Sequence, residues 1–375
     1  MTPTGRLGVY VHVPFCAAHC PYCDFTVAVV RDIPHEAYAD AIAREWAVRQ
    51  DERDGRALRT LYFGGGTPGL WEPGALAKTI ATIGGQPEEV TLEVNPEFCD
   101  AERLRAWRAA GVNRISLGTQ SFCDTTLARL GRSHTGEEAR AAVLRAHEAG
   151  FERVSVDLMF AVPGEPRGRL ERDLAAVTSL PVEHVSAYEL TVEPRTAWAA
   201  RVARGELAEY DEARAVDASR RISEALAGAG FARYEVSSFA REGGESLHNS
   251  AYWVGDEYLG LGVGAHSLCI DGGVATRRAN ARSLKRYLEG RAQLPELERL
   301  SPEEHARELV MVGLRTAAGV DLDALARRVA PLPGVRDAAL RWQARGWVTM
   351  ERDRVRVQGE GWLWLDTMSG EALSA

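Results

Sequence analysis

The chain has 375 residues and a formal net charge of −8, with 45% hydrophobic and 26% charged residues; it can therefore bury one large core, alone or with a small appended domain. The negative charge excludes broad binding to a phosphate backbone, which needs a basic face, so no nucleic-acid partner is expected. No apolar run approaches the roughly 18 residues of a membrane-spanning helix and no secretory signal is visible at the start, so we expect a cytoplasmic protein without an integral membrane segment.

The first half of the chain predicts strands and helices in alternation. Strands are expected at 7–13, 59–65, 89–96, 114–121, 153–160 and 184–191. Helical periodicity separates them, at 33–50, 73–83, 100–110, 137–149 and 167–179. This alternation predicts an α/β fold in which a parallel sheet with right-handed crossovers is closed or partly closed as a barrel.

The remainder of the chain divides into two further sections. One contains a helix at 211–229, a strand-like 231–240 and a glycine-rich 255–267. The other predicts helices at 302–315, 322–328 and 335–345, then strands at 347–352 and 354–359 around a turn at Asp353. Three helices and a hairpin are typical of a winged-helix domain, and the negative charge favours a packing module over a DNA reader. We therefore expect a core barrel at 1–205, an extension at 206–295 and a C-terminal α+β winged-helix-like domain at 296–375.

Polar residues follow several of the predicted strands. In a parallel barrel the carboxyl ends of the strands meet at one face, where chemistry collects. The residues expected at this mouth are Gly64 to Thr67, Glu93, Asn95, Gln120 and Asp157.

Three cysteines lie close together in 16-CAAHCPYCDF-25, directly after the first strand. Thiolates at this density favour zinc or an iron–sulfur centre. Structural zinc usually takes four ligands in two pairs, and Cys99, Cys123 and Cys269 are isolated. Three thiolates suit a [4Fe-4S] cluster with one iron left open; zinc and unligated thiols are the alternatives.

The spacing Cys16-x3-Cys20-x2-Cys23 after the first strand of a βα barrel resembles the radical S-adenosylmethionine (SAM) superfamily. The segment 10-YVHVPFCAAHCPYCDF-25 is similar to the branch that holds oxygen-independent coproporphyrinogen III dehydrogenase and the HemW heme chaperones, and the resemblance covers nearly the whole chain. It implies a partial parallel (β/α)6 radical SAM barrel. It also implies that SAM binds the open iron, where the superfamily generates a 5′-deoxyadenosyl radical.

The same resemblance implies the residues that contact SAM. The run 64-GGGTP-68 is similar to the element that holds the methionine amino group, although a tight turn would explain the glycines equally well. Carboxylates could accept from ribose hydroxyls or the ammonium group, and Arg132 could pair with the SAM carboxylate. The implied contacts are Tyr10, Gly65, Gly66, Thr67, Glu93, Gln120, Arg132 and Asp157; Asn95 fits less securely.

Two functions from different classes remain. The dehydrogenase carries a further cysteine two residues after the third, where this chain has Phe25, and Cys-Asp-Phe is the HemW form. The segment 248-HNSAYW-253 matches the HNxxYW motif of HemW, which implies heme binding at His248. We therefore favour a heme chaperone over coproporphyrinogen III dehydrogenase or another radical SAM enzyme, and assign no catalytic residue.

This interpretation carries further expectations. Heme delivery needs an exchangeable iron ligand, so His248 is expected at the surface, flanked by aromatic rings. The implied partners are heme, heme-acceptor proteins of unknown identity and an electron donor for the cluster. A homodimer and transient association with a membrane are left open.

Overall fold

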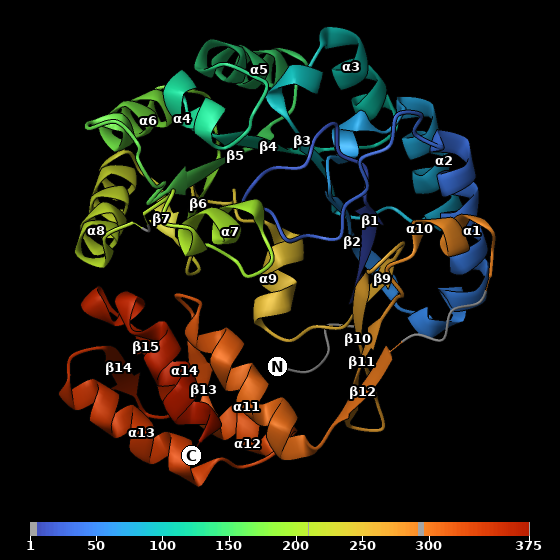
Figure 1. The fold of residues 1–375 in the computed structure, drawn as a ribbon. Coiled ribbons are helices and arrows are strands. Elements are labelled where there is room, and N and C mark those ends of the chain that lie inside the picture. The colour runs from blue at the N-terminus through green and yellow to red at the C-terminus, as the bar shows by residue number, and fades with distance from the viewer. Residues whose placement is uncertain (1–5, 209, 292–295, 375) are drawn as a thin grey trace.

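The computed structural model describes residues 6–208, 210–291 and 296–374. Six parallel strands form the centre of the molecule and confirm the predicted alternation (Figure 1). They are β1 (Arg6–Val13), β2 (Ala57–Gly65), β3 (Glu89–Val94), β4 (Arg114–Gln120), β5 (Arg153–Phe160) and β6 (His184–Glu189).

The crossover helices cover the outer face of these strands (Figure 1). They are α1 (His35–Arg49), α2 (Pro73–Ile83), α3 (Ala101–Ala109), α4 (Asp124–Arg129), α5 (Gly136–Glu148) and α6 (Arg169–Thr178). Short 3-10 turns η1 (Gln50–Arg53), η2 (Pro68–Leu70) and η3 (Pro96–Phe98) lie between them. Local signals set the helix starts: Thr135 and Glu138 form a capping box on α5, and Asp100 caps α3.

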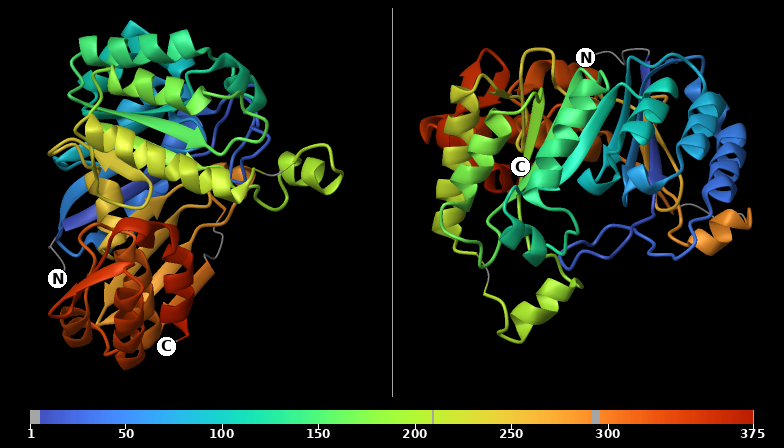
Figure 2. Two further views of the ribbon diagram at one scale, coloured as in Figure 1. Left: turned by 90° about the vertical axis from the view of Figure 1, so that its left-hand side faces the viewer. Right: turned by 90° about the horizontal axis from the view of Figure 1, so that it is seen from above.

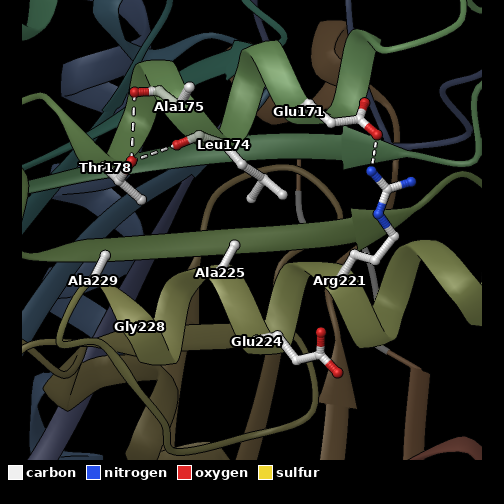
Figure 3. A pocket seen from close by; sticks show the side chains of 9 residues that line it. All are labelled: Glu171, Leu174, Ala175, Thr178, Arg221, Glu224, Ala225, Gly228 and Ala229. Carbon is white, nitrogen blue, oxygen red and sulfur yellow. Dashed lines mark hydrogen bonds and ion pairs between the residues drawn. The ribbon is translucent and has the colours of Figure 1, made fainter.

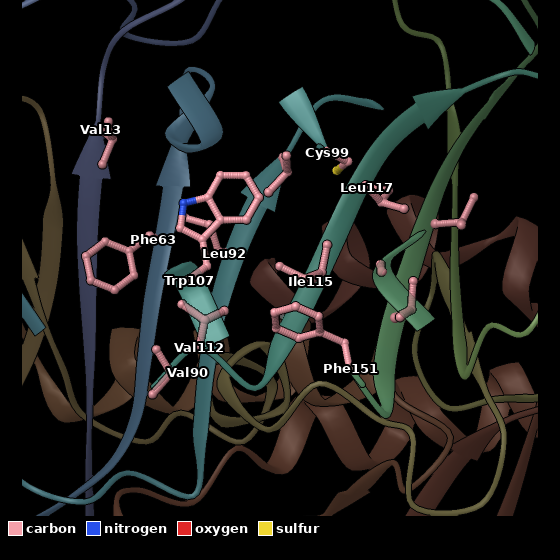
Figure 4. Close-up of a cluster of buried hydrophobic side chains, with 14 of the residues drawn as sticks. Val13, Phe63, Val90, Leu92, Cys99, Trp107, Val112, Ile115, Leu117 and Phe151 are labelled. Atoms are coloured by element: carbon pink, nitrogen blue, oxygen red, sulfur yellow. The ribbon is translucent and has the colours of Figure 1, made fainter. Parts of the chain in front are cut away.

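The main core lies between the sheet and this helical layer. Leu92 and Ile115 point outward from β3 and β4 and meet the fully buried rings of Trp107 and Phe151 (Figure 4). Truncating such a side chain typically costs about 2–5 kcal/mol, because a cavity adds to the lost apolar burial. This core holds the strands in register and so positions the residues at their carboxyl ends.

The six strands belong to a twelve-stranded sheet, in the order β12-β11-β10-β9-β1-β2-β3-β4-β5-β6-β8-β7. The added strands are β7 (Ala232–Arg233), β8 (Ser238–Ala240), β9 (Tyr258–Leu261), β10 (His266–Asp271), β11 (Val274–Ala279) and β12 (Glu296–Leu300). Because the order runs from β12 to β7, the barrel is partial. The expected strand-like 231–240 forms two short strands, and β10 to β12 were not predicted.

Four further helices follow the sixth parallel strand. They are α7 (Ala197–Ala203), at the end of the predicted core section, and α8 (Glu212–Gly228), α9 (Leu247–Trp253) and α10 (Leu284–Leu288) in the second section. α9 lies across the opening of the barrel, where it contacts β2 and the later helix α11 (Figure 1). α6 and α8 pack side by side, and the shallow groove between them is bridged by an ion pair from Arg221 to Glu171 (Figure 3).

The C-terminal section has its own core, around Val310, Trp342 and Met368. Its elements are α11 (Pro302–Leu314), β13 (Val320–Asp321), α12 (Leu322–Arg328), α13 (Pro333–Ala344), β14 (Val348–Glu351), β15 (Arg354–Val357), η4 (Gly359–Leu363) and α14 (Leu365–Leu373). The three helices and the hairpin match the winged-helix-like pattern, and α14 is an addition. The boundaries at 205/206 and 295/296 stay predictions. No described helix is long and apolar enough to cross a membrane.

Candidate functional site

A cavity of about 770 Å³ opens at the carboxyl ends of the parallel strands. Its volume lies within the range of ligand and cofactor pockets. The residues predicted for this mouth share it: the lining includes Cys16, Cys20, Cys23, Gly65, Gly66, Thr67, Glu93, Asn95, Gln120, Arg132 and Asp157.

The three cysteines belong to a loop that is closed at its base by backbone hydrogen bonds. Cys16 N donates to Ala28 O at 3.1 Å, and Ala28 N donates to Pro14 O at 2.7 Å. The hydroxyl of Thr67 lies 3.8 Å from the Cys16 sulfur. We call residues 14–28 the cysteine loop.

The thiols of this loop fit a cluster better than a single metal ion. No three His, Cys, Asp or Glu side chains converge on one point in the part of the chain that the structure describes. The three thiols instead line one cavity, and a four-iron cluster takes each thiolate on a different iron. Burial raises the pKa of Cys16 to about 11 and also raises that of Cys23, so metal binding must displace protons.

Helix α7 packs against the same loop. Its segment projects from the body of the molecule in both views of Figure 2. Trp198 N donates to Pro21 O at 3.0 Å, and the Trp198 ring lies 6.0 Å from that of Tyr22. This aromatic pair shields one side of the cysteine loop from water.

Backbone hydrogen bonds join the glycine-rich turn after β2 to the end of β1 and the start of the cysteine loop. Gly66 N donates to Val13 O at 2.9 Å and Thr67 N to Phe15 O at 2.7 Å. A Cβ at Gly66 would lie 2.7 Å from Phe15 O, and Gly65 has a φ of +118°. Glycine is therefore required here by close approach and by backbone conformation.

Two half-buried carboxyl groups, Glu93 on β3 and Asp157 on β5, line the cavity near the glycine turn. Glu93 accepts from Tyr62 Oη at 2.7 Å and from Gly65 N at 3.2 Å. Burial, and next the charge of Glu93, raise the pKa of Asp157 to about 7; burial also raises the pKa of Glu93. The two groups resist ionising together, so near neutral pH the pair can both donate and accept hydrogen bonds.

Of the three further residues predicted to contact SAM, two line the cavity and one does not. Gln120 ends β4 with a φ of +66°, and Arg132 Nη2 donates to Gly118 O at 2.7 Å; both line the cavity. Tyr10 is not among the lining residues. Its hydroxyl bonds His12 Nδ1 at 3.0 Å, and His12 Nε2 bonds Thr26 O at 2.7 Å. Tyr10 therefore supports the base of the cysteine loop from inside the barrel.

His248 is buried, with 1% of its surface exposed, so the expectation of a surface-accessible histidine is wrong. Its Nδ1 lies 2.8 Å from Thr60 Oγ1 and its Nε2 lies 2.7 Å from Tyr252 Oη. Its ring stacks on Tyr62 at 4.9 Å. Burial lowers the pKa of His248 to about 3.

The start of α9 explains this burial. The backbone N–H groups of Leu247 and His248 donate to the carboxylate of Glu89 at 3.2 and 3.0 Å. Glu89 is fully buried at the start of β3. A carboxylate at a helix N-terminus is favourable, and this one draws His248 into the barrel.

Sequence reasoning missed several lining residues. Gly118 and Ser116 precede the predicted Gln120 by two and four positions, and Met159 follows the predicted Asp157 by two, so period-2 alternation along β4 and β5 would have found them. Tyr188, at the end of β6, also lines the cavity and is 41% exposed.

The fold and the site define a class, the radical SAM proteins. Residues 10–177 match the radical SAM superfamily, and residues 300–364 match the HemN C-terminal domain. The solved structure of coproporphyrinogen III oxidase (HemN) from Escherichia coli shares the fold, with a TM-score of 0.82, 23% identity and coverage of 99% of this chain and 91% of that one.

Sequence comparison then identifies the family. The heme chaperone HemW of Mycobacterium tuberculosis (strain ATCC 25618 / H37Rv) is 36% identical over 378 residues, covering 98% of this chain and 94% of that protein. HemW of Bacillus subtilis (strain 168) is 34% identical over 321 residues, covering 83% and 84%. The chain belongs to the HemW family.

Proposed function

We propose that this protein is a heme chaperone, which binds heme and delivers it to acceptor proteins while holding a [4Fe-4S] cluster and SAM. The observation that carries the proposal is the shared cavity, in which three thiols meet a glycine turn, two carboxyl groups and an arginine. The names of the relatives support the heme cargo.

In this proposal Cys16, Cys20 and Cys23 hold three irons of the cluster, and the fourth stays open for SAM. The bound cluster and SAM supply radical or electron-transfer chemistry. Gly65, Gly66 and Thr67 offer backbone groups to the methionine end of SAM.

Other lining residues orient the rest of SAM. Arg132 carries the positive charge that a SAM carboxylate requires. Glu93 and Asp157 can accept hydrogen bonds from hydroxyl or ammonium groups, and Gln120 lies beside them on β4. Tyr10 does not line the cavity; it supports the cysteine loop through the hydrogen bonds from its hydroxyl to His12 and from His12 to Thr26 O.

Heme contact at His248 remains the prediction from the HNSAYW segment. Both ring nitrogens of His248 have hydrogen-bond partners, so iron ligation there requires the bond to Thr60 or the bond to Tyr252 to break. His248→Ala is the direct variant: if His248 binds heme, hemin titration weakens while the cluster absorbance is retained.

The proposal as a whole is tested by anaerobic reconstitution of the cluster and titration with hemin, with and without SAM. Saturable hemin binding and transfer to an apo-hemoprotein are expected. Incubation with coproporphyrinogen III, SAM and a reductant is the decisive alternative assay. Decarboxylated product would replace the chaperone proposal with the dehydrogenase.

A further inference from the structure

The parallel strands are apolar on their outer side and polar on their inner side. Leu92 on β3 and Ile115 on β4 pack outward against the helical layer (Figure 4). Because side chains alternate along a strand, the residues one position away face the inside of the barrel. On three neighbouring strands these are Thr91 and Glu93 of β3, Arg114 and Ser116 of β4, and Ser155 and Asp157 of β5. The inside of the barrel is therefore not an ordinary apolar core.

A second cavity, of about 40 Å³, lies among these inward-facing side chains. Every residue that lines it carries a polar side chain. Four of them, Glu93, Ser116, Asp157 and Tyr188, also line the larger cavity that holds the three thiols. The second cavity is therefore adjacent to the place proposed for SAM, with these four side chains between the two spaces. We call it the inner chamber.

Two residues that line the inner chamber have buried polar atoms without a hydrogen-bond partner among the described residues. Thr91 is 1% exposed, and its Oγ1 is one of these atoms. His184 is 2% exposed; its Nε2 lies 2.8 Å from Tyr234 Oη, whereas its Nδ1 is the second unpartnered atom. Buried polar groups are hydrogen-bonded with few exceptions, and ordered water supplies the partner where protein atoms do not. The inner chamber therefore requires a small polar ligand.

The size and the charges of the inner chamber select water as this ligand. A buried water needs at least about 10–15 Å³ and two to four polar partners, so about three waters fit. Glu93 and Asp157 disfavour an anion. Arg114 disfavours a cation, because its guanidinium is buried beside the chamber and donates to Ser155 Oγ at 2.9 Å. Hydroxyl groups, which both donate and accept, provide further partners for water.

We propose that the inner chamber binds about three ordered waters, which Thr91 and His184 hold and which hydrogen-bond the inner side of Asp157. This inference rests on the proposed binding of SAM, and it assigns Thr91 and His184 as positioning residues for that binding. Glu93 is already fixed by two hydrogen bonds, so the waters act chiefly on Asp157. Hydrogen bonds from the layer behind a binding group hold that group in the orientation that binding needs.

The first test is a SAM titration of the full chain with its cluster reconstituted. Thr91→Val keeps the shape of the side chain and removes the hydroxyl, and loss of one hydrogen bond is expected to weaken SAM binding by about three- to tenfold. Thr91→Ser keeps the hydroxyl and is expected to bind SAM as the parent does, which a merely structural threonine would not achieve. Thr79→Val is the matched control: Thr79 is equally buried on α2, its hydroxyl donates to Ala75 O, and SAM affinity should not change.

A high-resolution crystal structure of the cluster-loaded parent protein is the second measurement. We expect ordered waters within hydrogen-bonding distance of Thr91 Oγ1, His184 Nδ1 and the Asp157 carboxyl group. A dry chamber, a bound ion or waters that do not reach Asp157 would overturn the inference. Parent-like SAM affinity of Thr91→Val, or an equal loss in Thr91→Ser, would also overturn it. Failure of the parent protein to bind SAM would instead overturn the proposed binding of SAM, and the crystal structure would still decide whether the chamber holds water.

Discussion

At the scale of single residues, the inside of the barrel holds titratable groups away from bulk water. Burial lowers the pKa of His248 and raises that of Asp157. Each shift is a statement about stability, because the folded and unfolded chains then bind different numbers of protons. The shift at His248 makes the fold less stable as the pH falls, and the shift at Asp157 makes it less stable as the pH rises.

His248 gives the first prediction. Its folded pKa of about 3 lies below the ordinary histidine value of 6.5, so its stabilising contribution is present above pH 6.5 and is lost as the pH falls below 6.5. We expect the unfolding free energy of the parent to decrease, between pH 6.5 and 4, faster than that of His248→Gln. The difference reaches about 1.4 kcal/mol per pH unit and is measured by urea unfolding. Parallel curves for the two proteins would contradict the burial of a neutral His248.

Asp157 gives a second prediction with the opposite sign. Its folded pKa of about 7 exceeds the ordinary aspartate value of 3.8, so the ionised carboxylate destabilises the metal-free fold at high pH. We expect Asp157→Asn to stabilise the metal-free protein at pH 8 by more than about 1 kcal/mol, with a smaller gain at pH 5. The same change should weaken SAM binding to the cluster-loaded protein. Equal SAM affinity of the two proteins would remove Asp157 from the proposed contacts.

At the scale of elements, the cysteine loop and the glycine turn form one unit, because backbone hydrogen bonds join them. The loop supplies the thiols, and the turn supplies the wall against which SAM is proposed to bind. A change in either element should therefore disturb the cluster or SAM without unfolding the outer helices.

The thiols are tested one at a time. Cys16→Ala, Cys20→Ala and Cys23→Ala should each abolish nearly all cluster absorbance after reconstitution, because three thiolates are the minimum set with one open iron. Cys269→Ala, on β10, is the control and should keep the iron and sulfide content of the parent. Full iron content in any of the first three variants would contradict the ligand assignment.

The glycine turn is tested by Gly66→Ala. The added Cβ would lie 2.7 Å from Phe15 O, so the turn must move away from the cysteine loop. We expect a loss of SAM affinity of about tenfold or more by calorimetry, as for other displaced contacts. Gly74→Ala on α2 is the control, since no atom lies within 4 Å of its added Cβ, and its SAM affinity should match that of the parent.

At the scale of the whole molecule, two hydrophobic cores are joined around α9. The C-terminal section contacts the barrel through α11, and Val236 N donates to Arg315 O at 2.8 Å. A winged-helix-like domain on a chain of net charge −8 lacks the long-range attraction that DNA binding needs. We expect no saturable binding of a labelled DNA duplex at 50 mM salt (a condition that favours such binding), measured by anisotropy. Salt-dependent, saturable binding would contradict the packing role.

The sequence predicted the parallel strands, their helices and the C-terminal pattern, because these depend on local periodicity and caps such as Thr135 with Glu138. It also predicted the shared mouth, since consecutive parallel strands present their carboxyl ends together. The sequence predicted one strand where the structure has the short strands β7 and β8, and it did not predict the hairpin of β10 and β11. Short strands carry little periodic signal.

The sequence by itself determined the candidate site residues that share the cavity, because the thiol spacing, the glycine turn and the polar strand ends are local patterns. Only the tertiary structure decided that His248 is buried. The backbone of His248 is hydrogen-bonded to Glu89, 159 positions away in the chain, and Gly264 lies against Thr26 of the cysteine loop. Such pairings depend on how distant segments pack, and no window of neighbouring residues contains that information.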